Sequence, residues 1–407
     1  MADDQRTQDV GARITDEGIE RMRARIGVEV PKEQPWNEYA TVDAIRHFAW
    51  SYGDDNPLYS SPEYAANTRW KGVIAPPTFV HTTGVSVVKE IPPEVREKGK
   101  GALAGVNALF AGNVLECFQP VRADDRLIER RVLHSVDVKE SRFSGGISVH
   151  NIDRQVYLNE QGQVTTVWFK RFIRTERQRA SEKTGKRTVE RAVYTQEQLR
   201  EFDEAYASET RRGAEPRYWE DVKVGDAMQA MLKGPLTLSD VVAWMQGSGR
   251  AEILPSRLGW KNRQRHPKFY TLNDFGVPEA AMRCHWDDSW ARKIGSPYAF
   301  DMGNMRTAWH CQLVSDWMGD DGWMWRLETQ IRAFSYIGDT HWLGGTVTRK
   351  YVDGERRCVE LQIWARNQRD EVTSPGKAIV ILPSRLHGPA TLPAAPPELE
   401  ERRPNDG

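Results

Sequence analysis

The stretch that decides the fold of this chain is His285-Trp-Asp-Asp-Ser-Trp-Ala-Arg-Lys-Ile-Gly-Ser-Pro-Tyr-Ala-Phe-Asp301-Met-Gly303. It places an imidazole and several carboxylates shortly before a glycine that opens an apolar segment. An imidazole titrates near neutral pH and can accept or release a proton. The first N–H groups of a helix can stabilise a developing negative charge on oxygen. The stretch therefore predicts a site that moves a proton next to a carbonyl group.

An altered copy of this stretch occurs in the first half of the chain. It runs from Tyr59-Ser-Ser-Pro-Glu-Tyr-Ala65 through Gly72-Val-Ile-Ala-Pro-Pro77. Without a gap, Tyr59 aligns with His285 and Pro77 aligns with Gly303. The chain is therefore interpreted as a duplication in which one copy kept its histidine and the other did not.

The duplication extends on both sides of these stretches. Segments 42–50 and 238–245 both have the apolar spacing of a helix, with Thr41 and Ser239 as expected N-caps. Longer apolar helices are expected over 78–88 and 304–317. Alternating segments with turns at 159–165 and 367–373 then predict antiparallel strands. Each half is therefore expected to be α+β, with an antiparallel sheet wrapped around one central apolar helix.

The expected domain organisation follows from this pattern. Four regions are expected along the chain: an N-terminal domain over 1–180, a charged linker helix over 181–215, a C-terminal domain over 216–390 and a flexible tail over 391–407. The second half also has 30 extra residues, because 35 residues separate Arg250 from His285 whereas five separate Asp54 from Tyr59. This insertion, 251–284, is expected to form a lid or a wall of the site.

Composition excludes several classes of function. The 407 residues include 57 Lys+Arg and 57 Asp+Glu, so no overall basic field favours nucleic acid as a partner. No apolar run is long enough to span a membrane. The four cysteines show no metal-binding spacing, which predicts free thiols, a cytoplasmic location and no metal.

The motif Gly53-Asp54-Asp-Asn56-Pro-Leu-Tyr59, followed by Ala65 and Gly72-Val-Ile-Ala75, resembles the motif of MaoC-like acyl dehydratases and R-specific enoyl-CoA hydratases. That family motif is Gly-Asp-x-Asn-Pro-x-His, then Ala, then Gly-x-Ile-Ala-His-Gly. The resemblance implies a double hot-dog fold, with two antiparallel sheets each wrapped around a central helix. It also implies a hydro-lyase acting on an acyl thioester of CoA or of a carrier protein, with no further cofactor.

Neither copy matches the family motif completely. In the first half Asp54 and Asn56 match, but Tyr59 replaces the catalytic histidine, so this site is interpreted as degenerate. In the second half His285 matches the histidine, whereas Arg250 stands in place of the catalytic aspartate. The resemblance therefore implies that His285 is the base and that the second catalytic group comes from elsewhere.

The second group remains open among several carboxylates. Asp287 lies two residues after His285, and Asp301 lies at the mouth of the helix opened by Gly303. Glu252 and Asp274 come from the insertion. Asp301 is favoured because the thioester is expected at the helix mouth. Residues that are expected to hold the substrate or its oxyanion are Gly303, Met302, Arg250 and Tyr270.

Two other functions remain open from the sequence. The missing aspartate leaves room for another hot-dog activity, such as thioester hydrolysis or a ring-forming addition. A non-catalytic acyl-binding subunit is the third hypothesis. A double hot dog already resembles a dimer, and further association into a homodimer is compatible with the sequence.

Overall fold

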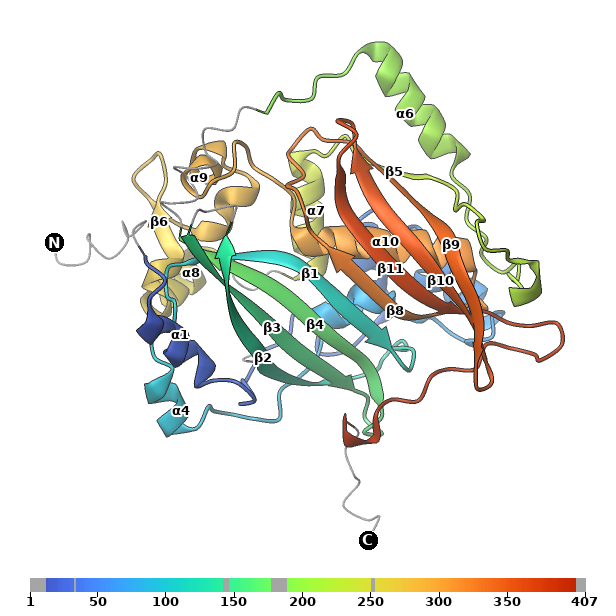
Figure 1. Cartoon of the computed structure of the whole chain (residues 1–407), viewed down its shortest axis with the longest axis horizontal. Coiled ribbons are helices and arrows are strands. Elements are labelled where there is room, and N and C mark those ends of the chain that lie inside the picture. Colours follow the sequence, from blue (N-terminus) through green and yellow to red (C-terminus); the bar gives the residue numbers. More distant parts are fainter. Residues whose placement is uncertain (1–11, 33, 142–145, 177–188, 250–252, 400–407) are drawn as a thin grey trace, which may run out of the picture.

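The computed structural model describes residues 12–32, 34–141, 146–176, 189–249 and 253–399. Nine strands form one continuous antiparallel sheet in the order β2-β3-β4-β1-β8-β11-β10-β9-β5 (Figure 1). These strands are β1 (Asn107–Cys117), β2 (Ile128–Ser141), β3 (Gly146–Leu158), β4 (Val164–Thr175), β5 (Met231–Lys233), β8 (Trp323–Gln330), β9 (His341–Asp353), β10 (Arg356–Asn367) and β11 (Val372–Ile381).

The single sheet corrects the expectation of two separate sheets. The four strands of the first half and the five of the second join where β1 pairs with β8, from Gly112 opposite Gln330 to Glu116 opposite Arg326. Unpaired strand edges expose N–H and C=O groups that attract other chains. Pairing β1 with β8 satisfies an edge from each half, so the two half-sheets become one.

The second half contains the central helix that the sequence predicts. Helix α10 (Gly303–Met318) lies against β1, β8, β9, β10, β11 and the short helix η2 (Figure 1). All its residues except Gly303 and Asp316 are buried. A helix surrounded by protein needs no separate polar stripe, and α10 accordingly buries polar side chains such as Arg306 and His310 together with its apolar ones.

The first half lacks the helix expected over 78–88. Only the 3-10 helix η2 (Pro77–Thr82) forms there, and it ends just before Gly84. Gly84 has φ of +90°, and a Cβ atom at this position would lie 2.7 Å from Cβ of Glu129. The chain therefore turns at Gly84 and runs along the start of β2, where Val85 bridges Ile128.

The helix that precedes each motif is present in both halves. These helices, α2 (Val42–Trp50) and α7 (Leu238–Ser248), lie in contact with each other. Thr41 is the N-cap of α2 as expected, but the N-cap of α7 is Thr237 rather than Ser239. Thr237 and Asp240 form a reciprocal capping box, which fixes the helix start at Leu238.

Smaller helices surround the sheet. They are α1 (Asp16–Arg23), η1 (Pro57–Tyr59), α3 (Pro62–Ala66), α4 (Pro93–Lys98), α6 (Gln196–Ser208), η3 (Trp219–Asp221), α8 (Ser256–Arg265), η4 (Pro267–Phe269), η5 (Ala281–His285), α9 (Asp288–Lys293) and η6 (Pro397–Leu399). Helix α6 begins after Thr195, within the predicted linker helix. The described part of the insertion forms α8 and the hairpin β6–β7 (Tyr270–Leu272, Pro278–Ala280).

The duplicated stretches adopt the same local structure. Ser61 caps α3 in the first half, and Asp287, which aligns with it, caps α9 in the second. The amide of Ala75 donates to the carbonyl of Val121 at 2.8 Å, and the amide of the aligned Asp301 donates to Ser335 at the same distance. The alignment drawn from sequence is therefore reproduced in the backbone.

Candidate active site

His285 ends η5 and lies beside an apolar cluster that includes Phe300, three residues before the start of α10 along the chain. Its side chain is buried, and its ring packs edge-on against Phe300 with 4.9 Å between the ring centroids. Nδ1 lies 2.9 Å from the carbonyl oxygen of Phe300. A carbonyl can only accept, so Nδ1 carries the hydrogen and Nε2 is the basic nitrogen of the neutral ring. Phe300 thus fixes the orientation and the tautomer of His285.

The start of α10 lies three residues after Phe300. Met302 is the buried N-cap residue of the helix, and Gly303 is its first residue. A Cβ atom on Gly303 would lie 2.8 Å from Cδ1 of Phe110, which is on β1 of the first half. Gly303 is therefore needed for close packing between the halves, in addition to any role of its backbone N–H toward a ligand.

Asp301 is held by a buried ion pair. Its two carboxylate oxygens accept from Nε and Nη2 of Arg306 at 2.6 and 2.9 Å, and both side chains are almost inaccessible to solvent. Burial raises the pKa of Asp301, whereas Arg306 opposes this shift. Arg306 also donates to the carbonyl of Ala333. This arrangement favours a structural role for Asp301 over the acid role expected from the sequence.

Asp287 is occupied at the start of α9. One oxygen accepts from the amides of Ser289 and Trp290 at 2.8 and 3.1 Å, and the other accepts from Nε of Arg283 at 3.0 Å. Burial acts to raise the pKa of Asp287, but these hydrogen bonds lower it overall. A carboxyl group with a lowered pKa is ionised at neutral pH and is a poor proton donor. The structure therefore favours capping for Asp287 as well.

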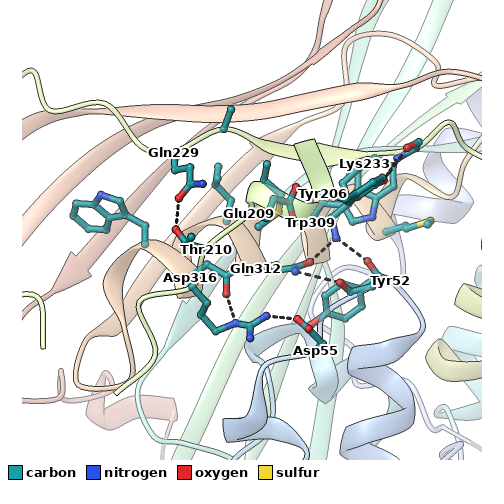
Figure 2. A pocket seen from close by; sticks show the side chains of 18 of the residues that line it. Tyr52, Asp55, Tyr206, Glu209, Thr210, Gln229, Lys233, Trp309, Gln312 and Asp316 are labelled. Carbon is teal, nitrogen blue, oxygen red and sulfur yellow. Dashed lines mark hydrogen bonds and ion pairs between the residues drawn. The ribbon is translucent and has the colours of Figure 1, made fainter. Parts of the chain in front are cut away.

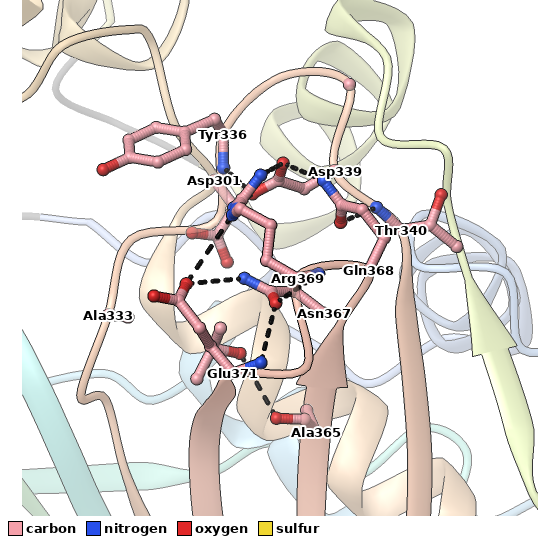
Figure 3. Close-up of polar contacts among 12 residues, drawn as sticks. Asp301, Ala333, Tyr336, Asp339, Thr340, Ala365, Asn367, Gln368, Arg369 and Glu371 are labelled. Carbon is pink, nitrogen blue, oxygen red and sulfur yellow. Dashed lines mark hydrogen bonds and ion pairs between the residues drawn. The ribbon is translucent and has the colours of Figure 1, made fainter. Parts of the chain in front are cut away.

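A polar network anchors the loop that lies against the segment before α10. Asp339 accepts from Arg369 at 2.7 and 2.5 Å and from the amide of Tyr336 at 2.9 Å (Figure 3). Gln368 donates to the same carboxylate at 2.7 Å. Because the amide of Asp301 donates to Ser335 in this loop, the network holds the backbone that presents Phe300 and Gly303.

The other expected site residues lie in the insertion or directly before it. Tyr270 is buried at the start of β6, and its hydroxyl accepts from Asn262 at 2.9 Å. Asp274 is exposed and accepts from the hydroxyl of Ser289 at 3.3 Å. Arg250 and Glu252 lie outside the described residues.

The first copy of the motif is packed without a histidine. Asp54 is buried and accepts from the amide of Asn56 at 3.0 Å and from the hydroxyl of Tyr52 at 3.2 Å. Asn56 caps η1 through Leu58. Tyr59 is buried, and its hydroxyl lies 3.3 Å from Oγ of Ser315 in α10. Tyr59, which aligns with His285, thus packs against the central helix of the other half.

A cleft of about 1080 Å³ lies near this first copy and does not include His285 or Gly303. It is bounded by the end of α2, the segment after α6, β5 and one face of α10 (Figure 2). Lys233 is buried in its wall and donates to the carbonyl of Tyr52 at 2.9 Å and to Gln312 at 2.6 Å. Arg211 donates to Asp316 at 2.8 Å. Sequence reasoning missed this cluster, because its members come from four distant segments.

Three residues at the start of α10 were also missed. His81 at the end of η2 lies between Lys170 of β4, at 3.3 Å, and Asn304 of α10, at 3.5 Å. The only sequence signal was that His81 closely follows Pro76, where the family motif has histidine. The first half therefore brings polar groups to the helix start that also bears Gly303.

Three general features of the described residues concern thiols, membrane spans and metal sites. All four cysteines are buried, and none is in a disulfide bond. In the described part of the chain, no helix is long and apolar enough to cross a membrane. Within the same ranges, no group of three or more His, Cys, Asp or Glu side chains is placed to hold a metal ion.

Sequence comparisons point to one family. Residues 24–166 match the model of the FAS1-like dehydratase domain region. A UPF0336 protein of Streptomyces avermitilis is 30% identical over 111 residues, which are 27% of this chain and 70% of the relative. A UPF0336 protein of Streptomyces coelicolor is 28% identical over 149 residues, 37% of this chain and 92% of the relative. The chain belongs to the MaoC-like hot-dog dehydratase family.

Solved structures of this MaoC-like type show the same fold over most of the chain. A MaoC-like dehydratase superposes with a TM-score of 0.60 and 18% identity, covering 88% of this chain and 99% of the other. A conserved hypothetical protein of Mycobacterium tuberculosis with a double hot-dog fold gives a TM-score of 0.51 at 8% identity, covering 91% and 99%. The α+β hot-dog class expected from sequence is thus confirmed.

Proposed function

We propose that this MaoC-like protein is a hydro-lyase that interconverts a 3-hydroxyacyl and a 2-enoyl thioester of CoA or of a carrier protein. The observation that carries the proposal is the contact of His285 Nδ1 with the carbonyl of Phe300 at 2.9 Å. It makes Nε2 the basic nitrogen of a ring bound to the residue three positions before α10. Hydration of an enoyl thioester needs such a base to remove a proton from water.

The start of α10 supplies the second requirement of the reaction. Attack of water on the β-carbon moves negative charge onto the thioester oxygen. The first N–H groups of a helix have no acceptor within the helix, and the helix dipole favours negative charge there. We assign the thioester oxygen to the first turn of α10, near Met302 and Gly303. No further cofactor is part of this proposal.

The experiment compares the wild type with His285→Ala, using crotonyl-CoA and trans-2-decenoyl-CoA. Wild type is expected to convert them to 3-hydroxyacyl-CoA, and His285→Ala is expected to lower kcat by about 10²–10⁴-fold. The loss of the enoyl absorbance measures kcat, and mass analysis identifies the product. Tyr59→Phe is the matched control, because Tyr59 holds the aligned position in the first copy.

Two outcomes would contradict the proposed reaction. Release of free acid would indicate a thioesterase. Binding of both thioesters without turnover would indicate a non-catalytic acyl-binding subunit. A loss of less than about tenfold in His285→Ala would reject His285 as the base while leaving the reaction intact.

A further inference from the structure

His81 is the polar side chain of the first half that reaches the start of α10. It belongs to η2 and is partly exposed, whereas most of η2 is buried. Nε2 of His81 lies 3.5 Å from the side-chain amide of Asn304, the residue after Gly303. Nδ1 lies 3.3 Å from Nζ of Lys170 on β4. The imidazole therefore bridges a lysine of one half and the helix start of the other.

The contact with Lys170 fixes where the proton of His81 resides. An ammonium group has three donors and no acceptor, so Nδ1 of His81 must accept. In a neutral imidazole the hydrogen is then on Nε2, the nitrogen that faces Asn304. The amide nitrogen of Asn304 faces Nε2 at 3.5 Å, and a flip of this amide brings its oxygen to the same place, where it accepts from Nε2–H. His81 thus presents an N–H toward the first turn of α10.

Lys170 differs from a solvated lysine on a strand face. Its side chain is buried, and its ammonium lies 4.1 Å from the ring centroid of Trp168, which partly offsets the cost of burial. The ring of Trp168 also packs edge-on against His81 with 6.1 Å between centroids. Among the described residues, the buried Nε1 of Trp168 has no hydrogen-bond partner. The cluster therefore holds a desolvated cation and an unsatisfied donor beside the helix start.

Resting on the hydro-lyase function proposed above, we propose that His81 is the proton donor to the α-carbon and that Lys170 supplies its proton. In hydration, His285 Nε2 takes a proton from water while the oxygen bonds to the β-carbon. The C=C electron pair then takes the proton from Nε2 of His81, and Nδ1 receives one from Lys170. Lys170 is left as a neutral amine, and His285 as an imidazolium. Exchange with solvent then deprotonates His285, reprotonates Lys170 and returns His81 from the Nδ1–H to the Nε2–H tautomer, so one water adds in total.

This assignment agrees with the state of the carboxylates. Asp301 is bound to Arg306 by two hydrogen bonds, and Asp287 is bound by three donors. Neither has to leave its partners when His81 is the donor. The assignment also gives the first half a chemical role although its own motif lacks a histidine.

The test uses His81→Gln and Lys170→Arg with the same two enoyl-CoA substrates. Glutamine keeps a hydrogen-bond donor but cannot relay a proton, and arginine keeps the positive charge but does not release its proton near neutral pH. Both variants are expected to lower kcat by about 100-fold or more, with KM within about threefold of wild type. The rate of deuterium incorporation at the α-carbon in D₂O is expected to fall by the same factor.

His134→Gln is the matched control. His134 is an exposed histidine of β2 that packs against Phe169 and lies outside this cluster. It is expected to leave kcat unchanged, and thermal unfolding of all variants checks their folding. Nitrogen chemical shifts of His81 are expected to show a protonated Nε2 and an unprotonated Nδ1.

The outcomes separate this inference from the proposed function. If the wild type hydrates neither substrate, the proposed function fails and this assignment fails with it. If the wild type is active and His81→Gln keeps kcat within about threefold, only the His81 assignment is overturned. Full activity of Lys170→Arg would overturn the proton transfer from Lys170 to His81. Nitrogen chemical shifts that place the hydrogen on Nδ1 of His81 would overturn it as well.

Discussion

The two copies of the motif have similar local backbone structures but different side chains at aligned positions. In the second half, His285 and the buried pair Asp301–Arg306 surround the start of a long helix. When the alignment is continued by three residues, Ala75 and Val80 occupy the positions of that ion pair in the first half, and both are buried. Apolar side chains fill these positions where the short helix η2 stands in place of a long helix. The buried ion pair therefore belongs to the copy that has the long helix.

The most disruptive way to test this comparison is to break the buried pair. Asp301→Ala leaves Arg306 unpaired in the interior, so the free energy of unfolding is expected to fall by about 3–5 kcal/mol. Adding Arg306→Val then gives these two positions the alanine and valine that the first half has at Ala75 and Val80. The double variant is expected to regain part of this loss, because no charge is left buried. Urea unfolding measures all three proteins.

Asp43→Ala serves as the control for the broken pair. Asp43 pairs with Arg46 on the surface of α2, where its side chain is 71% exposed. Its loss is expected to cost less than about 1 kcal/mol. A double variant that is less stable than Asp301→Ala would show that the two halves tolerate different side chains at these positions.

The next largest effect concerns Gly303 and its contact with the other half. In Gly303→Ala the added methyl group would meet the ring of Phe110, so stability is expected to fall by about 1–3 kcal/mol. Combining it with Phe110→Leu is expected to recover part of the stability by opening space. Thermal unfolding of the single and double variants checks this. Pro77→Ala at the aligned position of the first half is the control. A loss of stability in Pro77→Ala as large as that in Gly303→Ala would show that the two copies do not differ at this position.

A smaller effect is expected from pH at the cleft beside the first copy. Burial, together with the charge of Asp54, raises the pKa of Asp316 to about 7. A raised pKa means that the folded state binds the proton more tightly, so this contribution to stability is full at acidic pH. It is lost as pH rises from the ordinary aspartate range through about 7. The free energy of unfolding at about pH 8 should therefore be lower than that at about pH 5, by on the order of 1 kcal/mol from this group.

Asp316→Asn is the variant that isolates this contribution. It is expected to make stability less dependent on pH across that window, because the titrating carboxyl group is absent. The exposed Asp370, whose side chain is 86% exposed, gives the matched control Asp370→Asn. An unchanged pH dependence in Asp316→Asn would assign the effect to a neighbouring group instead.

The smallest effect is expected from restoring the missing histidine. Tyr59→His in an inactive His285→Ala background is expected to recover no measurable hydration. The first copy has Pro77 and the short η2 where the second has Gly303 and a long helix, so it lacks the helix start assigned to the thioester. Recovered turnover would show that the first copy retains a usable site.

Sequence alone predicted the repeated parts of the fold well. Periodicity and alignment located α10, both hairpin turns and the α+β class, because these depend on local spacing. The joined sheet was not predictable in this way, since the pairing of β1 with β8 depends on contacts between distant segments. The missing first-half helix was also not predicted, because the turn at Gly84 follows from its packing against Glu129.

For the site, sequence identified positions but not partners. The motif alignment singled out His285, whereas its contact with Phe300 and the partners of Asp301 and Asp287 appear only in three dimensions. The motif comparison directed attention to residues near His285 in sequence. His81 and Lys170 lie far from it along the chain and meet α10 only because the halves fold together.

The pairing of β1 with β8 has a consequence for how this protein evolved. A sheet shared by both halves holds two copies of one ancestral unit in a fixed ratio and orientation within a single chain. In an assembly of identical subunits, a substitution alters every copy at once. In a fused chain, selection can act on each copy separately, so Tyr59 and the short η2 could arise in one copy while the other kept His285.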